Sequence, residues 1–163
     1  VDRAVKKLQQ AESGLAPEDI NVRLNHIDQT IPESYIRSTS QRLSLYKALG
    51  TLPTKEDLWD FRNGIENRFG ALPESVLNIF RHAEVRLWGQ LHGVETIEHD
   101  RNRLRIQLKD ASKLNHEKLI EWLCEPETAL SYIPENTLDY KNVPPEMPAI
   151  LNGLKKLEQV FTV

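Results

Sequence analysis

A change in hydrophobic period near Gly93 limits the fold of this chain more than any other feature. Before it, apolar residues recur every three or four positions, and the longest such stretch begins at Pro73 and carries Val76, Leu77, Phe80, Ala83, Leu87, Trp88 and Leu91. After it, apolar and polar residues alternate over 94–99 and again over 104–108. These periods predict a long amphipathic helix followed by a β-hairpin. Helices in the first half and strands in the second predict an α+β fold, a helical N-terminal half packed with a small, mostly antiparallel sheet and a C-terminal helix.

Capping signals predict two shorter helices before the long one. The first is expected to begin at a Ser40 cap and end at Gly50, with its apolar face formed by Leu43, Tyr46 and Leu49. The second follows a capping box of Thr54 and Asp57 and ends at Gly70, with an apolar face of Leu58, Phe61, Ile65 and Phe69. Segment 31–36 is too short and too close to a proline for a helix, so we expect an ordered loop there.

The remaining segments complete the expected sheet and its helices. Alternating residues predict strands over 20–24, 129–133 and 137–141. Asn115 is placed to cap a short helix carrying Leu119, Ile120 and Leu123, and a last helix is expected to begin near Pro145. Its apolar face would be Met147, Ile150, Leu151, Leu154, Leu157 and Phe161.

The N-terminal residues predict the end of a longer helix. Val1, Ala4, Val5 and Leu8 have helical spacing, yet no capping residue precedes them, and the only methionine is Met147. We therefore expect the sequence to be a fragment, in which residues 1–17 end a linker helix from an upstream domain and residues 18–163 form a single domain.

Composition excludes several classes of function. With 21 Lys and Arg against 24 Asp and Glu, the chain lacks the basic surplus of a protein that coats nucleic acid. The seven glycines form neither a dinucleotide-binding nor a phosphate-loop motif. No apolar stretch approaches the ~20 residues of a membrane helix, and no signal peptide is apparent, so we expect a cytoplasmic protein without a membrane partner.

Candidate catalytic residues have simpler structural interpretations. The histidines at 26, 82, 92, 99 and 116 form no metal-binding motif and are expected at the surface or at edges. Cys124 is expected in or near the core. The acidic group of Glu56, Asp57 and Asp60 would complement a helix dipole. A small stand-alone enzyme is kept only as a remote alternative, and no metal or cofactor is expected in the chain.

Arg101, Arg103 and Arg105 cluster around the predicted hairpin and would share one face of a strand. Such a stripe could contact phosphate, which keeps a nucleic-acid-binding module as an alternative function. Cross-strand pairing with Glu95, Glu98 and Asp100 is the simpler interpretation. DNA binding by this chain is therefore not expected.

Four ordered motifs carry a resemblance to a known family. IPESYI at 31–36, QRLSLYK at 41–47, TKEDL at 54–58 and NRFGALPE at 67–74 follow at nearly the spacing of IPxxYI, RLxLYKRL, TxxEL and ELxDRFGPLPE. The chain thus resembles the C-terminal domain of bacterial transcription-repair coupling factors. The motifs cover its middle third, and the later elements fit the same order.

The resemblance implies a regulatory role without catalysis. The parent would be an ATP- and Mg-dependent double-stranded DNA translocase that displaces stalled RNA polymerase and recruits nucleotide-excision repair proteins, with its motor upstream of this chain. The C-terminal domain would dock on the N-terminal repair-protein-binding module of the same parent and restrain its activity. RNA polymerase and the repair proteins would be indirect partners, and the isolated domain is expected to be a monomer.

One departure from the family pattern concerns the expected docking surface. The family segment ELxDRFG carries two acids that would face basic residues of the masked module. Here Gly64 and Asn67 stand at those two positions, whereas Arg68 remains. Glu66 lies about 100° around the helix from Asn67 and could substitute only from another face. We therefore expect an interface at Gly64, Glu66, Asn67 and Arg68 that is rewired or weaker.

Overall fold

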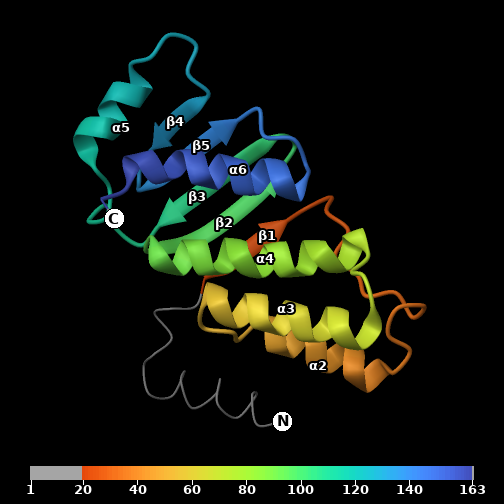
Figure 1. Ribbon diagram of the computed structural model, residues 1–163. Helices are drawn as coiled ribbons and strands as arrows, with labels where there is room; N and C mark the ends of the chain where they lie inside the picture. The colour runs from red at the N-terminus through yellow and green to blue at the C-terminus, as the bar shows by residue number, and fades with distance from the viewer. Residues whose placement is uncertain (1–19, 163) are drawn as a thin grey trace. The chain divides into compact units, whose positions relative to one another are not determined.

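The computed structural model describes residues 20–162, which fall into two compact units (Figure 1). Residues 28–87 form the first unit, and residues 20–27 together with 88–162 form the second. The expected linker helix over 1–17 lies outside the described residues. The proposal of a single domain over 18–163 stays a prediction.

Three helices build the first unit: α2 (Thr39–Leu49), α3 (Lys55–Phe69) and the part of α4 (Glu74–Leu91) that ends at Leu87. All three were predicted from the apolar spacing. Their buried residues form one core together with the loop that precedes α2, and the cluster consists of Ile31, Ile36, Leu45, Leu49, Leu58, Val76, Ile79, Phe80 and Ala83. The loop over 31–36 is therefore held by its two isoleucines.

The start and the buried face of α2 differ from the prediction. Ser38, not Ser40, is the N-cap, because its side chain accepts a hydrogen bond from the backbone N–H of Gln41. Leu43 and Tyr46 were placed on the apolar face but are 53% and 40% exposed. The buried face is instead Leu45, Ala48 and Leu49, a set that uses a small alanine where the prediction relied on larger side chains.

Helix α3 begins and ends as predicted. The Thr54 hydroxyl accepts a hydrogen bond of 3.1 Å from the Asp57 backbone N–H. Gly70 ends the helix with φ +95°, a conformation that disfavours residues with a Cβ atom. Leu58 is buried, and Phe61, Ile65 and Phe69 pack against the core while staying partly accessible.

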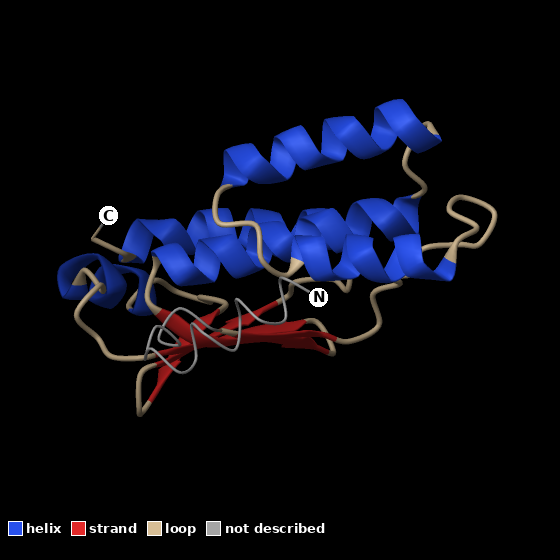
Figure 2. Ribbon diagram, turned by 90° about the horizontal axis from the view of Figure 1, so that it is seen from below, coloured by secondary structure: helices blue, strands red, loops and turns tan. Residues whose placement is uncertain are grey.

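The second unit contains a five-stranded sheet of order β1-β2-β3-β5-β4, seen edge-on as one layer in Figure 2. The strands are β1 (Asn21–Leu24), β2 (Val94–Asp100), β3 (Arg103–Leu108), β4 (Leu130–Ile133) and β5 (Thr137–Lys141). Only β1 and β2 run parallel. The predicted hairpin turns at Arg101 and Asn102, both with positive φ, as a type I′ turn requires. The α+β class and the mostly antiparallel sheet are confirmed.

Helices α5 (His116–Leu123) and α6 (Met147–Leu157) and the 3₁₀ helix η2 (Glu158–Val160) complete this unit. Asn115 caps α5 as predicted, accepting from the Lys118 N–H. Gly153 of α6 faces Leu104 of the sheet, where an added Cβ would lie 3.4 Å from a leucine methyl. One sheet face is therefore covered by α6 and is apolar.

The last turn of α4 also belongs to the second unit. A Cβ at Gly89 would clash with Ile20 and lie 3.1 Å from Ile97 Cδ1, so glycine allows this turn to approach the sheet closely. Leu91 was assigned to the apolar face but is 57% exposed. Among residues 20–162, no helix combines the length and apolar character needed to cross a membrane.

Candidate interdomain interface

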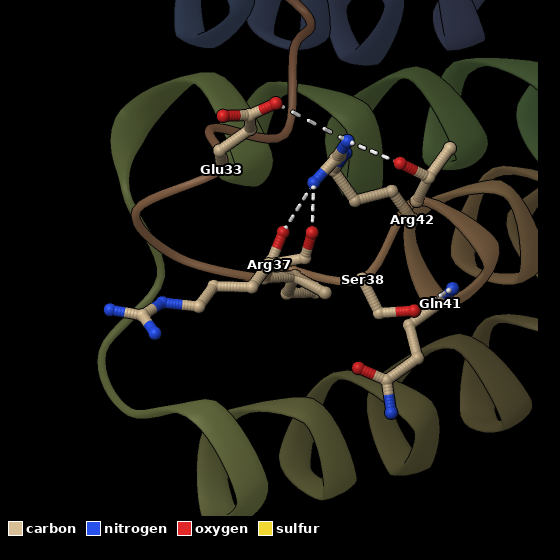
Figure 3. Close-up of polar contacts among 7 residues, drawn as sticks. Glu33, Arg37, Ser38, Gln41 and Arg42 are labelled. Atoms are coloured by element: carbon tan, nitrogen blue, oxygen red, sulfur yellow. Dashed lines mark hydrogen bonds and ion pairs between the residues drawn. The ribbon is translucent and has the colours of Figure 1, made fainter.

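Arg42 of α2 joins the first two of the four motifs. Its Nη1 donates to the carbonyl oxygens of Ile36 at 2.7 Å and Arg37 at 2.9 Å, and its Nη2 donates to Thr39 Oγ1 at 3.1 Å (Figure 3). Glu33 lies 3.8 Å from the same guanidinium. The side chain is only 16% exposed, so Arg42 fixes the 31–36 loop against the start of α2.

Two tyrosines tie the first motif to the second and to the fourth. The Tyr46 hydroxyl accepts from the Ile31 N–H at 3.1 Å and donates to the Gln29 carbonyl at 3.3 Å. The Tyr35 hydroxyl donates to the Gly70 carbonyl at 2.7 Å, and its ring contacts Phe69. The loop of the first motif is thereby tied to both α2 and the end of α3, which positions the helix carrying the expected docking residues.

The expected docking residues lie on the second half of α3. Gly64, Asn67 and Arg68 are exposed, whereas Glu66 is partly buried. A Cβ at Gly64 would meet no atom within 4 Å. Around the helix, Gly64 lies between the other two, about 60° from Asn67 and about 40° from Arg68. The structure therefore places Gly64, Asn67 and Arg68 on one exposed face of α3, with Gly64 in the middle.

Glu66 is engaged within the first unit. Its Oε1 accepts a 3.1 Å hydrogen bond from Arg62 Nε, in an ion pair four residues apart. Burial raises the pKa of Tyr35, and the negative charge of Glu66 raises it further. Because its charge already faces these two groups, Glu66 is a poor replacement for an acid at position 64 or 67.

Arg68 offers a positive charge without a carboxylate partner in the part of the chain that the structure describes. Its guanidinium lies over the Phe69 ring, 5.1 Å from the centroid. Trp59, two turns earlier on α3, is 45% exposed and is covered by Arg62 at 5.4 Å. The sequence analysis did not identify Trp59 as an exposed aromatic residue. It could have done so, because Trp59 lies outside the apolar face formed by Leu58, Phe61, Ile65 and Phe69.

The hairpin arginines pair with an acid that the sequence analysis did not consider. Arg103 and Arg105 each lie 3.7 Å from Asp139 of β5, whose side chain is only 4% exposed. Two of the predicted acidic partners, Glu98 and Asp100, do lie opposite Arg105 and Arg103 in the strand register. Their ion pairs are nevertheless with Arg23 and His26. Pairing across β3 and β5 could not be foreseen because the long connection between them hides their register.

In the strand register, charges of opposite sign alternate across the sheet, an arrangement called the charge ladder below. Arg23, Glu98, Arg105 and Asp139 lie opposite one another in successive strands β1, β2, β3 and β5. Arg101 lies in the turn and does not share the face of Arg103 and Arg105. The polar sheet face is thus largely self-neutralised, and it is not the basic stripe that a phosphate contact needs.

The remaining candidate catalytic residues are dispersed. His92 and His99 are buried, contrary to the expectation of surface or edge positions. His99 Nε2 donates to the Val143 carbonyl at 2.7 Å. Cys124 is exposed at the end of α5, so its expected core position is wrong. Among residues 20–162, no three His, Cys, Asp or Glu side chains gather into a group that could hold a metal.

A family model for the TRCF domain matches residues 25–119, which is more than half of the chain. The chain therefore belongs to the TRCF domain family. Its fold is also similar to that of a solved structure described as the C-terminal domain of transcription-repair coupling factor. That likeness has a TM-score of 0.65 at 17% identity and covers 86% of this chain and 95% of the other.

Curated relatives carry the name transcription-repair-coupling factor. The Borreliella burgdorferi protein is 25% identical over 130 residues, covering 77% of this chain and 12% of the relative. A Staphylococcus epidermidis protein is 32% identical over 112 residues, covering 68% and 9%. The Haemophilus influenzae protein is 26% identical over 127 residues, covering 74% and 11%. The chain thus spans about a tenth of the length of these relatives.

Proposed function

We propose that this chain is the non-catalytic, autoregulatory C-terminal domain of a transcription-repair coupling translocase. The parent would use ATP and Mg to move along double-stranded DNA, displace stalled RNA polymerase and recruit excision-repair proteins in the cytoplasm. This domain would dock on the N-terminal repair-protein-binding module of the same parent and restrain its activity. Membership of the TRCF domain family supports the assignment.

The observation that carries the docking proposal is the exposed second half of α3. Gly64 and Asn67 occupy the positions of the two family acids, and both are fully available on the outside of the helix. The C-terminal end of the helix is fixed by Tyr35. The Tyr35 hydroxyl donates a hydrogen bond to the Gly70 carbonyl, and its ring packs against Phe69. A held helix with an open outer face suits a contact between domains.

The clamp acts as a two-state device. In the closed state this domain would contact the N-terminal module, and in the open state it would not. The ratio of the two populations depends on the free energy of that contact. An interface that must open is expected to be moderate in size and polar. With Gly64 and Asn67 in place of two acids, and with Glu66 paired to Arg62, the closed state is expected to be less favoured than in relatives that retain both charges.

A binding assay in trans tests this proposal. The 163-residue chain and the N-terminal module of its own parent are titrated at two salt concentrations. We expect weak binding with little salt dependence. The double variant Gly64→Glu and Asn67→Asp should bind at least tenfold more tightly and should lose that gain at high salt. The double variant Asn152→Asp and Gln159→Glu adds two negative charges at exposed positions of the second unit, outside the expected interface, and serves as the control.

Two results would contradict the proposal in different ways. Strong, salt-sensitive binding by the unchanged chain that is lost in Arg68→Ala or Glu66→Gln would show that the clamp is not weakened. No binding by either the chain or the double variant would remove the docking role altogether. Duplex DNA in the same assay tests the alternative nucleic-acid module, which requires a steep salt-dependent affinity.

A further inference from the structure

An apolar groove runs between α2 and α3 in the first unit, with a volume of about 520 Å³. Helix α2 contributes Gln41, Ser44, Leu45, Lys47 and Ala48, and helix α3 contributes Phe61, Ile65, Arg68 and Phe69; Ile36 closes one side. Gly64 and Asn67 do not line it. The groove therefore lies beside the proposed docking face of α3 and shares only Arg68 with it.

The depth of the groove follows from the sizes of the facing residues. Ser44 and Ala48 are one turn apart on α2. Because both side chains are small, they leave space on the α2 side of the groove. On α3, Phe61, Ile65 and Phe69 recur at every fourth residue and remain partly accessible after packing against the core. A third helix laid between α2 and α3 would cover these three apolar side chains.

The rim of the groove is positively charged. Lys47 and Arg68 stand on opposite sides of it, and both are exposed. The lining contains no Asp or Glu. Within residues 20–162, neither cation has a carboxylate within ion-pair distance. An occupant that places carboxylates beside both cations would add two attractive contacts that the domain does not make by itself.

We propose that this groove binds an amphipathic helix of a partner protein, with apolar residues at helical spacing and acidic residues along both borders. The apolar side of the helix would cover Phe61, Ile65 and Phe69. Its carboxylates would pair with Lys47 on one border and Arg68 on the other. This inference does not depend on the docking role of Gly64 and Asn67.

Two synthetic helical peptides test the groove directly. They share one length and one pattern of leucines, but glutamates flank the leucines in the first and lysines in the second. Fluorescence anisotropy with the 163-residue chain should show saturable binding of the glutamate peptide only. Ser44→Trp, which fills the groove from an exposed position, should weaken that binding at least tenfold. Lys47→Glu with Arg68→Glu should weaken it to a similar extent.

Matched controls separate the groove from general electrostatics. The double variant Arg37→Glu and Lys55→Glu makes the same changes of charge at exposed positions outside the groove and should bind within twofold of the unchanged chain. Circular dichroism confirms that each variant is folded. Equal binding of both peptides, no binding of the glutamate peptide, or full binding by Ser44→Trp would overturn the proposal. Self-association of the chain in sedimentation that Ser44→Trp abolishes would instead assign the groove to a second copy and overturn it too.

Discussion

Replacing Arg42 with alanine should destabilise the first unit more than any change at a comparably placed surface arginine. The guanidinium donates three hydrogen bonds, two of them to carbonyl oxygens of the 31–36 loop and its neighbour. Its removal leaves these acceptors to water and frees the loop from the start of α2. Arg37 is the matched control, since its own side chain is exposed and points away from this cluster (Figure 3).

The expected magnitude follows from the number and kind of these contacts. A hydrogen bond to a charged group contributes about 1.5–3 kcal/mol, so three would sum to about 4.5–9 kcal/mol. Part of this is recovered because carbonyls near the surface rehydrate, and because about 2 kcal/mol of arginine side-chain entropy is released. We therefore expect Arg42→Ala to lower the free energy of unfolding by about 2–4 kcal/mol, and Arg37→Ala to change it by less than about 0.5 kcal/mol.

Urea unfolding followed by far-ultraviolet circular dichroism measures the difference. With a slope near 2 kcal/mol per molar urea, the midpoint of Arg42→Ala should fall by about 1–2 M. Arg42→Lys keeps the charge but loses the forked geometry, so its midpoint should lie between those of the alanine variant and the unchanged chain. A midpoint for Arg42→Ala that matches that of Arg37→Ala would refute the assigned role of this guanidinium.

Three further predictions concern other parts of the molecule. Asp139→Asn removes the shared acidic partner of two half-exposed arginines and should cost about 1–3 kcal/mol in urea unfolding; an unchanged midpoint would contradict the charge ladder. Burial, and then the charge of Arg86, holds the pKa of His82 below its ordinary value. The unfolded chain therefore gains this proton first, and stability should drop as the pH falls below about 6.5, a loss that His82→Asn should reduce; an equally steep profile in the variant would exclude His82. Gly64→Ala, at an open helix position, should stabilise the chain by about 0.5–1 kcal/mol, whereas Gly89→Ala should cost about 1–3 kcal/mol; equal effects in thermal unfolding would contradict the packing at Gly89.

Period and capping residues were sufficient to predict most of the secondary structure. The Thr54 cap, the Gly70 stop and the Asn115 cap are local signals, because donor and acceptor lie within a few residues of each other. The N-cap of α2 was predicted wrongly because Ser38 and Ser40 are equally suitable residues. The extended backbone conformation of Ser38 makes it the cap, and the sequence does not show that conformation. Local chemistry therefore located the helices more reliably than it located their first residues.

Burial could be predicted less well than periodicity, since it depends on contacts distant in sequence. Tyr46 follows the apolar spacing of α2, but its hydroxyl forms hydrogen bonds with the Gln29 carbonyl and the Ile31 N–H. These bonds hold the ring near the surface. His99 has a polar side chain but occupies an inward position of β2 and finds the Val143 carbonyl there. The pairing of Asp139 could not be predicted for the same reason, because its partners Arg103 and Arg105 precede it by 36 and 34 residues, on another strand. Each case needed the register of the sheet or the path of a loop.

Helix α3 separates the residues that hold the fold from those that could set docking strength. Its inner side, with Leu58, Phe61 and Ile65, packs on the core. Its outer positions 64 and 67 are exposed, and a Cβ added at 64 would meet no atom within 4 Å. Charge can therefore be added to or removed from the outer face at little cost in stability, so the proposed docking could be strengthened or weakened without loss of the fold.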